Sequence, residues 1–107
     1  MRIGWIGGLG RNEGELQRIA ERAGHTLEFH EGHMKGRGAD DLRSIVRRSD
    51  FVIVVTDVNS HGAAILARRL AHQLGRGCLV VGKLGFARFQ ALLDAFAARD
   101  DRMRAAV

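Results

Sequence analysis

The feature that most constrains the fold is an uninterrupted run of apolar residues, Phe-Val-Ile-Val-Val, inside the segment 50–56. A strand without polar alternation is buried on both faces, which is typical of a central strand in a parallel sheet. Three further strands are predicted at residues 2–7, 25–30 and 78–82, and a helical pattern separates each strand from the next. This alternation requires right-handed crossovers and predicts an α/β fold, a four-stranded parallel sheet with helices on both faces.

The order of the strands follows from how exposed each is expected to be. The segment His-Thr-Leu-Glu-Phe-His at 25–30 alternates polar and apolar residues, which indicates one exposed face and an edge position. With 50–56 inside the sheet, the pattern favours the flavodoxin-like or Rossmann-like order 2-1-3-4. Residues 1–99 are predicted to form a single α/β domain, and residues 100–107 a charged C-terminal tail that frays.

Local signals predict where the helices start. Asn12 followed by Glu15 resembles a capping box at the first helix. An aspartate at 40 or 41 is expected to open the second helix. Asn59 or Ser60 is expected to cap the third helix, because short polar side chains accept hydrogen bonds from the first free N–H groups.

The charge balance is basic, with 17 Lys and Arg against 12 Asp and Glu. One interpretation is nucleic-acid binding through these cations. The arginines are spread along every helix, however, and a chain rich in Arg and Ala is also typical of a GC-rich genome. Hydrophobic residues make up 46% of the chain, which excludes a disordered protein.

The single cysteine, Cys78, excludes an internal disulfide. Its place in the run Cys-Leu-Val-Val predicts a small core residue in a reducing compartment. No stretch approaches the roughly 18 apolar residues of a membrane span, and the N-terminal residues leave no room for a signal peptide. We therefore expect a cytoplasmic protein that does not enter a membrane.

The polar residues that could carry chemistry follow the ends of the predicted strands, which lie along one edge of a parallel sheet where ligands bind. Gly7 and Gly8 follow the first strand and resemble a phosphate-binding turn. They are equally consistent with a tight turn, because the dinucleotide fingerprint and the P-loop pattern are both missing. Lys83 follows the last strand, where it is expected to neutralise an anionic ligand or to pair with Asp57.

Three histidines belong to the same predicted rim. His30 and His61 follow the strands that flank the first strand, and both are candidates to hold a transition metal or a haem iron. His33, in the glycine-rich segment 31–38, is a candidate third ligand. No local pair has the usual spacing of metal ligands, so each histidine also has an interpretation as a polar, hydrogen-bonding residue.

The segment after the third strand offers a second kind of chemistry. Asp57 and His61 are four residues apart across the expected helix start, where a carboxylate can orient an imidazole as an acid–base pair. Ser60 is either a helix cap or a nucleophile. Asp57, Asn59 and Ser60 are therefore predicted to contact a ligand.

Several pieces of the chain form one pattern along the rim. They are Gly7-Gly8, Phe29-His30-Glu31-Gly32, Ser49-Asp50-Phe51-Val52, Thr56-Asp57-Val58-Asn59-Ser60-His61, and Lys83 with Gly85 before Phe89. In these pieces the chain resembles, over residues 1–95, the bacterial family called Domain of Unknown Function 2325. The resemblance implies an architecture, not an activity.

The chain departs from the family pattern at three places. His33 stands where the second glycine of a His-x-Gly-Gly segment is expected, and Lys83 occupies a position that is often arginine. The residues Gly75-Arg76-Gly77 replace a usual proline. The first departure either adds a ligand or alters the loop.

Three functional hypotheses follow. The first is a non-enzymatic module that binds or senses a small ligand, preferably a haem or metal held through His30 and/or His61. The alternative is a phosphate- or nucleotide-binding module, or a small hydrolase or transferase that uses Asp57 with His61. The third is a nucleic-acid-binding protein. A homodimer is compatible with all three, because a sheet of this size has edges to pair.

Overall fold

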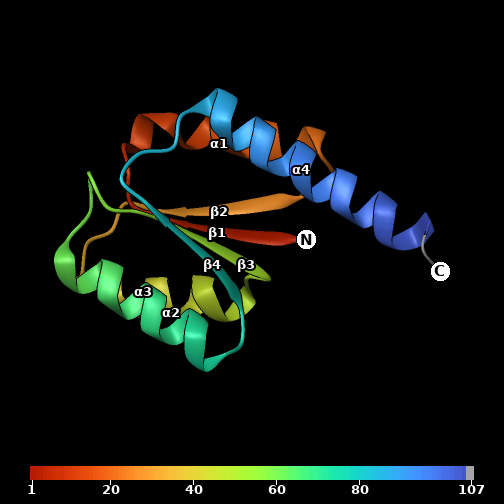
Figure 1. The fold of residues 1–107 in the computed structure, drawn as a ribbon. Helices are drawn as coiled ribbons and strands as arrows, with labels where there is room; N and C mark the ends of the chain where they lie inside the picture. Colours follow the sequence, from red (N-terminus) through yellow and green to blue (C-terminus); the bar gives the residue numbers. More distant parts are fainter. Residues whose placement is uncertain (106–107) are drawn as a thin grey trace.

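The structure, a computed structural model, describes residues 1–105 and contains a parallel sheet with helices on both faces (Figure 1). The strand order is β2-β1-β3-β4, which confirms the predicted fold and order. The elements along the chain are β1 (Arg2–Ile6), the 3-10 helix η1 (Gly10–Asn12), α1 (Glu13–Arg22), β2 (Thr26–His30), α2 (Gly38–Arg48), β3 (Phe51–Val55), α3 (His61–Gln73), β4 (Gly77–Val81) and α4 (Phe86–Ala105).

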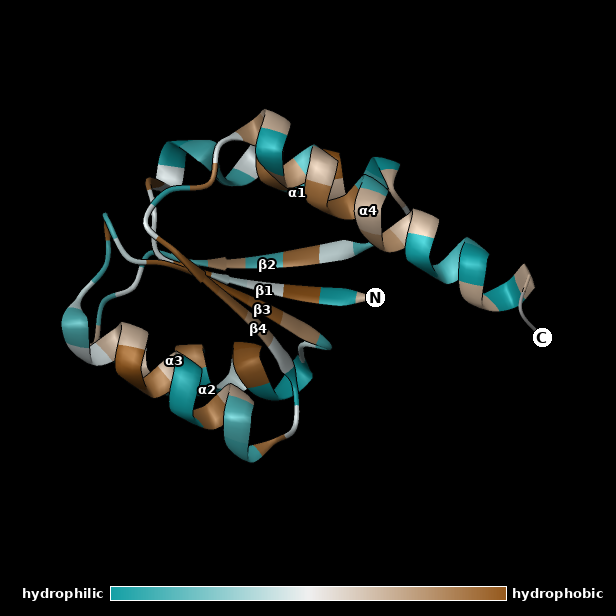
Figure 2. Cartoon of the chain, viewed as in Figure 1, coloured by the Kyte–Doolittle hydropathy of each residue, from teal (hydrophilic) through white to brown (hydrophobic). Residues whose placement is uncertain are grey.

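Successive side chains of each strand point to opposite faces of the sheet and build two cores. On the face covered by α1 and α4, Trp5 and Ile53 pack with Phe89, and the rings of Trp5 and Phe89 meet edge to face at 5.1 Å. On the face covered by α2 and α3, Ile6 and Val52 are fully buried. Figure 2 shows this division as hydrophobic strands between helices that carry their polar residues outward.

Helix α3 lies close to the sheet because small side chains form its inner face. Ala63, Ala67 and Ala71 recur every four residues, and all three are fully buried. This spacing places them on one stripe of an α-helix. The segment that follows β3 is thereby held directly over the sheet.

The helix starts agree only partly with the local signals. Ser60 caps α3, since its Oγ accepts a hydrogen bond from the Ala63 N–H at 3.1 Å. Asn12 occupies the predicted N-cap position of α1, but its side chain makes no capping hydrogen bond, so the expected capping box is not formed. Helix α2 begins at Gly38, before the aspartates. Helix α4 continues past residue 99 to Ala105, and residues 106–107 of the expected tail lie outside the described part.

The expected core position of Cys78 was wrong. β4 is an edge strand, and Cys78 is exposed on it. An apolar run at the edge of a sheet has the same sequence pattern as one at its centre. Only the strand order distinguishes the two positions.

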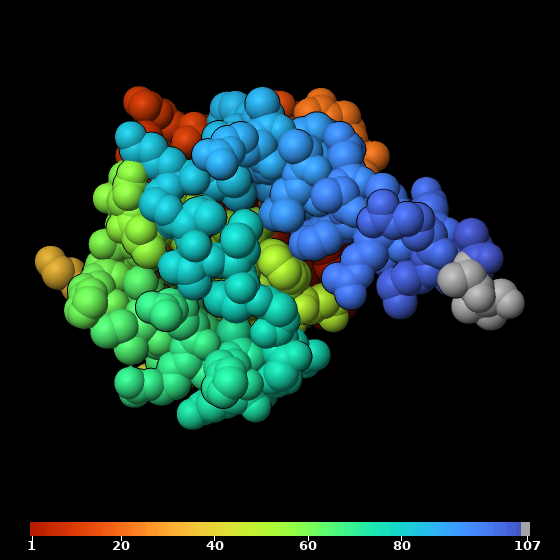
Figure 3. Space-filling model, viewed as in Figure 1, coloured from red at the N-terminus to blue at the C-terminus, as the bar shows by residue number. Residues whose placement is uncertain are grey.

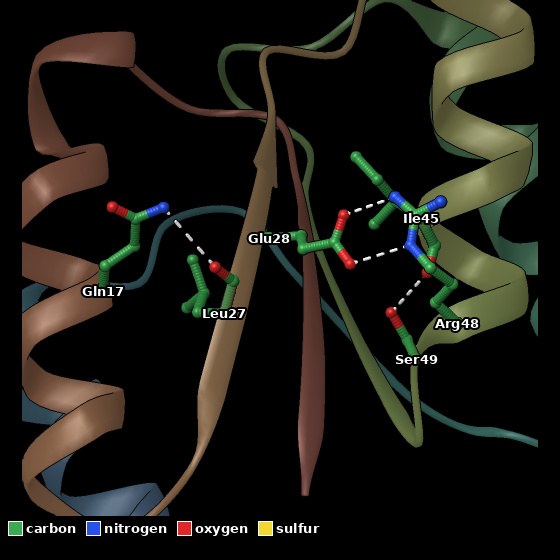
Figure 4. A network of polar contacts seen from close by, with 6 residues as sticks. All are labelled: Gln17, Leu27, Glu28, Ile45, Arg48 and Ser49. Carbon is green, nitrogen blue, oxygen red and sulfur yellow. Dashed lines mark hydrogen bonds and ion pairs between the residues drawn. The ribbon is translucent and has the colours of Figure 1, made fainter.

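The opposite edge is closed by polar side chains, as Figure 4 shows. Gln17 Nε2 donates to the Leu27 carbonyl at 3.5 Å, and Arg48 donates two hydrogen bonds to the carboxylate of Glu28. These bonds from Arg48 lower the pKa of Glu28 below its usual value. Both side chains of this pair are about half exposed, so the pair contributes only about 0–1 kcal/mol.

Close packing between β1 and the end of α2 depends on Gly4. A Cβ at this position would lie 2.5 Å from Ser49 Oγ and 3.2 Å from Ile45 Cγ2. Ser49 is itself buried, and its hydroxyl donates to the Ile45 carbonyl at 2.6 Å. The hydroxyl therefore has little freedom to move away from an added methyl group.

Replacing Gly4 should therefore destabilise the fold. We expect Gly4→Ala to lower the free energy of unfolding by about 1–3 kcal/mol, measured by urea denaturation. Adding Ser49→Ala should recover part of the loss, because it removes the nearest atom. The control is Gly14→Ala on exposed α1, where the nearest atom lies 3.8 Å away. A Gly4→Ala variant with an unchanged free energy of unfolding would contradict this packing.

Candidate functional site

The loops that follow the four strands meet at one end of the sheet, as the sequence predicted (Figure 1). They are joined to one another by backbone hydrogen bonds, which leaves few free groups at this rim. The bonds run from Gly7 N to His30 O (2.7 Å), Gly8 N to Val58 O (2.6 Å), Ser60 N to Gly32 O (2.9 Å) and Asp57 N to Gly82 O (3.0 Å).

The glycine turn after β1 is required by the conformation and packing of the backbone. Gly7 and Gly8 have φ values of +102° and +91°, a region that favours glycine. A Cβ on Gly7 would also collide with the Val55 carbonyl. Because both N–H groups are already used within the rim, neither is available to a phosphate in this conformation. The geometry thus favours the tight-turn interpretation, although Gly8 still lines a cavity described below.

Asn59 links the ends of the two central strands. Its Nδ2 donates to the carbonyls of Val55 at 2.9 Å and Ile6 at 3.3 Å. Its buried Oδ1 has no hydrogen-bond partner within residues 1–105 and lies where a Cβ on Gly32 would be. Asn59 therefore organises the rim, and it does not line the cavity.

His30 fastens the glycine-rich loop after β2. Its side chain is buried, with 6% exposed. The Gly32 N–H donates to Nδ1 at 3.0 Å, and Nε2 lies 2.8 Å from the Gly38 carbonyl. A backbone N–H can only donate and a carbonyl can only accept, so Nδ1 must be unprotonated while Nε2 carries the hydrogen. Both nitrogens are therefore occupied, and a metal at His30 would have to displace one of these bonds.

The other two candidate metal ligands do not join His30 around one cavity. His33 is exposed and stacks on the His30 ring, with centroids 5.1 Å apart. His61 is exposed at the first position of α3. Within residues 1–105, no three His, Cys, Asp or Glu side chains are grouped to hold a metal ion. Metal or haem binding through these histidines remains a prediction.

Asp57 pairs with Lys83 and not with His61. The Lys83 Nζ lies 3.9 Å from Asp57 Oδ2, and the two side chains are 86% and 41% exposed. No hydrogen bond links Asp57 to His61 in the described chain, and the hydroxyl of Ser60 serves as the helix cap. The expected acid–base pair is thus not assembled, whereas the expected pairing of Asp57 with Lys83 is present.

A cavity of about 310 Å³ opens beside these two residues on the α1 and α4 face. Its walls are mostly apolar, with polar groups from Asn12, Asp57 and Lys83. No histidine lines it. The lining residues are Trp5, Gly8, Leu9, Asn12, Leu16, Phe29, Val55, Asp57, Val58, Lys83, Leu84, Gly85 and Phe86.

Most of this apolar wall was not predicted from the sequence. One signal could have found it, because large hydrophobic residues stand in the loops where polar residues are usual. Leu9, Val58 and Phe86 are 40%, 45% and 41% exposed, and each follows a different strand. Their convergence on one cavity depends on the strand order.

A second, more open depression of about 530 Å³ lies beside β2 and α2. It contains His30 and His33 together with Glu28, Glu31 and Asp41. Arg48 also lines it and is held by Glu28. His33 is therefore exposed among carboxylates and His30 is buried next to it, and neither is among the residues that line the apolar cavity.

The role of His30 can be tested directly. We expect nitrogen NMR spectra at neutral pH to show the Nε2–H tautomer, and His30→Ala to destabilise the fold by about 1–3 kcal/mol for each buried group left unpaired. His72→Ala on the exposed face of α3 is the control, with an expected change below about 0.5 kcal/mol. An Nδ1–H tautomer would contradict the hydrogen bonds described.

Comparison with known proteins supports the resemblance carried by the rim. Residues 2–96 match the family model described as an uncharacterized protein conserved in bacteria (DUF2325). No curated protein matches the sequence, and no solved structure does. No helix within residues 1–105 is long and apolar enough to cross a membrane. Since the match spans most of the chain, the protein belongs to the DUF2325 family.

Proposed function

We propose that this chain binds, without transforming it, a small molecule that has a flat apolar body and one anionic group. The apolar cavity at the carboxyl ends of the strands carries this proposal. It lies over β1 and β3, where the chain reverses the direction in which strands are added to the sheet. Open α/β sheets bind their ligands at this point.

The walls of the cavity suit an apolar ring system. Trp5, Leu16 and Phe29 line one part of it, and Leu84 and Phe86 line another. The volume, about 310 Å³, is near the lower end of the range for small-molecule sites. A compact molecule of one or two rings therefore fits this space better than a large cofactor.

The mouth of the cavity favours a negative charge. Lys83 is 86% exposed, and its contact with Asp57 is long, so its ammonium group can turn towards a ligand at little cost. Helix α4 starts next to it at Phe86, directly after Gly85, which has no side chain with which to cap the helix. The first turn of α4 contains no acidic residue either. Its free N–H groups and positive helix end therefore attract an anion.

Asp57 and Asn12 supply the remaining polar contacts. Asp57 is 41% exposed at the mouth, and Asn12 makes no capping hydrogen bond, so both side chains are available to a hydroxyl or amine on the ligand. Within residues 1–105, no hydrogen bond joins either side chain to Ser60, whose hydroxyl caps α3. Binding without reaction is therefore better supported than the alternative of a hydrolase or transferase.

The same cavity supports an organic ligand better than haem. Its lining contains no histidine, cysteine or methionine, so a haem inside it would lack an axial ligand from the walls. A metal or haem would have to use His61 or the His30–His33 stack on the outside. The proposed site of action is the cytoplasm, where the exposed thiol of Cys78 stays reduced.

Two fluorescent probes test the site, anionic anilinonaphthalene sulfonate and neutral phenylnaphthylamine. Both should bind the wild type saturably, one per chain. Gly85→Leu should lower the affinity for both probes by about tenfold or more, because the added side chain would occupy open space beside the cavity wall. Lys83→Glu should lower the affinity for the anionic probe only. Fluorescence titration measures these affinities.

Gly14→Leu is the matched control, since it adds the same side chain at an exposed position of α1 and should leave both affinities unchanged. Equal affinities in Gly85→Leu and the wild type would refute the cavity as the site. Haemin added to the same samples tests the alternative, haem binding through the histidines. A Soret band that His61→Ala abolishes would move the site from the cavity to the histidines.

A further inference from the structure

The two edges of the sheet differ in how their backbone is protected. At the β2 edge, the carbonyl of Leu27 points away from β1 and accepts a hydrogen bond from Gln17 (Figure 4). Glu28 adds a charged pair with Arg48 on the same strand. Charged and polar side chains of this kind protect an edge strand from pairing with other chains.

β4 has no such protection. Among residues 1–105 it pairs only with β3, and its sequence, Gly-Cys-Leu-Val-Val, contains no charged residue and no proline. Figure 2 shows it as a hydrophobic strand. An edge of this composition is a template for another strand.

β4 is exposed because, within residues 1–105, no strand pairs with its outer side, and not because its residues are polar. Val80 is 39% exposed, whereas Val54, its partner in β3, is fully buried. Cys78, on the same face of the strand as Val80, is also exposed. Figure 3 shows the β4 atoms at the surface, between α3 and α4. A further strand beside β4 would bury these apolar side chains as β4 buries those of β3.

We propose that β4 is a dimerisation edge, along which a second copy of this chain pairs antiparallel across a two-fold axis. The two sheets would then form one continuous sheet. In this arrangement β4 of one copy faces β4 of the other. Because the strand carries no charge, the pairing brings no like charges together. An axis at Leu79 would place Cys78 of each copy opposite Val80 of the other.

The occupant is a second copy for two reasons. Arg68, whose charge reaches Cys78, could attract an acidic segment, but the strand itself holds no cation to select one. A standard interface buries about 800 Å² per partner, about one eighth of the 6573 Å² surface of this chain. Figure 3 shows β4 with parts of α3 and α4 on one side of the molecule, whose extents are 47 × 29 × 20 Å.

Analytical ultracentrifugation of the full chain tests the proposal. The wild type should sediment with twice the 11.8 kDa mass of one chain. Val80→Lys should raise the dimer dissociation constant by about tenfold or more, because it places a charge in an apolar interface. Thr26→Lys adds the same charge to the exposed start of β2 and should leave the dimer unchanged.

A second readout uses the single thiol. In the wild type, the reaction of Cys78 with Ellman's reagent should slow as protein concentration rises, whereas in Val80→Lys it should not depend on concentration. Circular dichroism shows whether each variant folds, and Cys78→Glu replaces Val80→Lys if the latter does not. A monomeric wild type, or a dimer that survives both β4 variants, would overturn the proposal.

Discussion

The parallel pairing of β1 with both β2 and β3 determines where the helices and the loops of this fold lie. Because β1 is flanked on both sides, the chain must add β2 in one direction and then return to add β3 and β4 in the other. Right-handed crossovers then place α1 on one face and α2 on the opposite face. All four carboxyl ends are brought to one rim, and the cavity forms there between the turns that follow the strands.

That rim is stabilised by its own backbone. The N–H groups of Gly7 and Gly8 bind neighbouring carbonyls, Asn59 holds the ends of β1 and β3, and His30 fastens its loop through both ring nitrogens. The N–H groups of Gly7 and Gly8 and both ring nitrogens of His30 are engaged in this way. The ligand site that we propose is the apolar space beside them, with the charge of Lys83 and the start of α4 at its mouth.

Much of the fold could be predicted because its signals are local. The apolar run 51–55 predicts a strand from its residues alone, and Ser60 lies directly before the helix it caps. The exposure of Cys78 could not be predicted from its own apolar run, which looks alike at an edge and at the centre. It follows from the strand order, which places β4 at an edge. The match of residues 2–96 to the family confirms the resemblance carried by the rim motifs.

The site was only partly predictable, for a related physical reason. The sequence places His30 at the rim, but whether its nitrogens are free depends on where Gly32 and Gly38 fold back. The cavity likewise needs Leu9, Val58 and Phe86 to converge from separate loops. The polar residues pointed to the end of the sheet where the cavity opens, whereas the exposed apolar residues Leu9 and Val58 in the turns gave no expectation of a cavity.

If ligands enter the apolar cavity, as we propose, and not the surface around His33, a bound probe must lie against the turns that form the cavity. Amide chemical shifts in ¹H–¹⁵N NMR spectra, recorded while anilinonaphthalene sulfonate is added, distinguish the two places. We expect the largest changes in the turns around Leu9, Val58 and Phe86, with little change at His33. Changes centred on His33 and Asp41, or spread evenly over the chain, would contradict it.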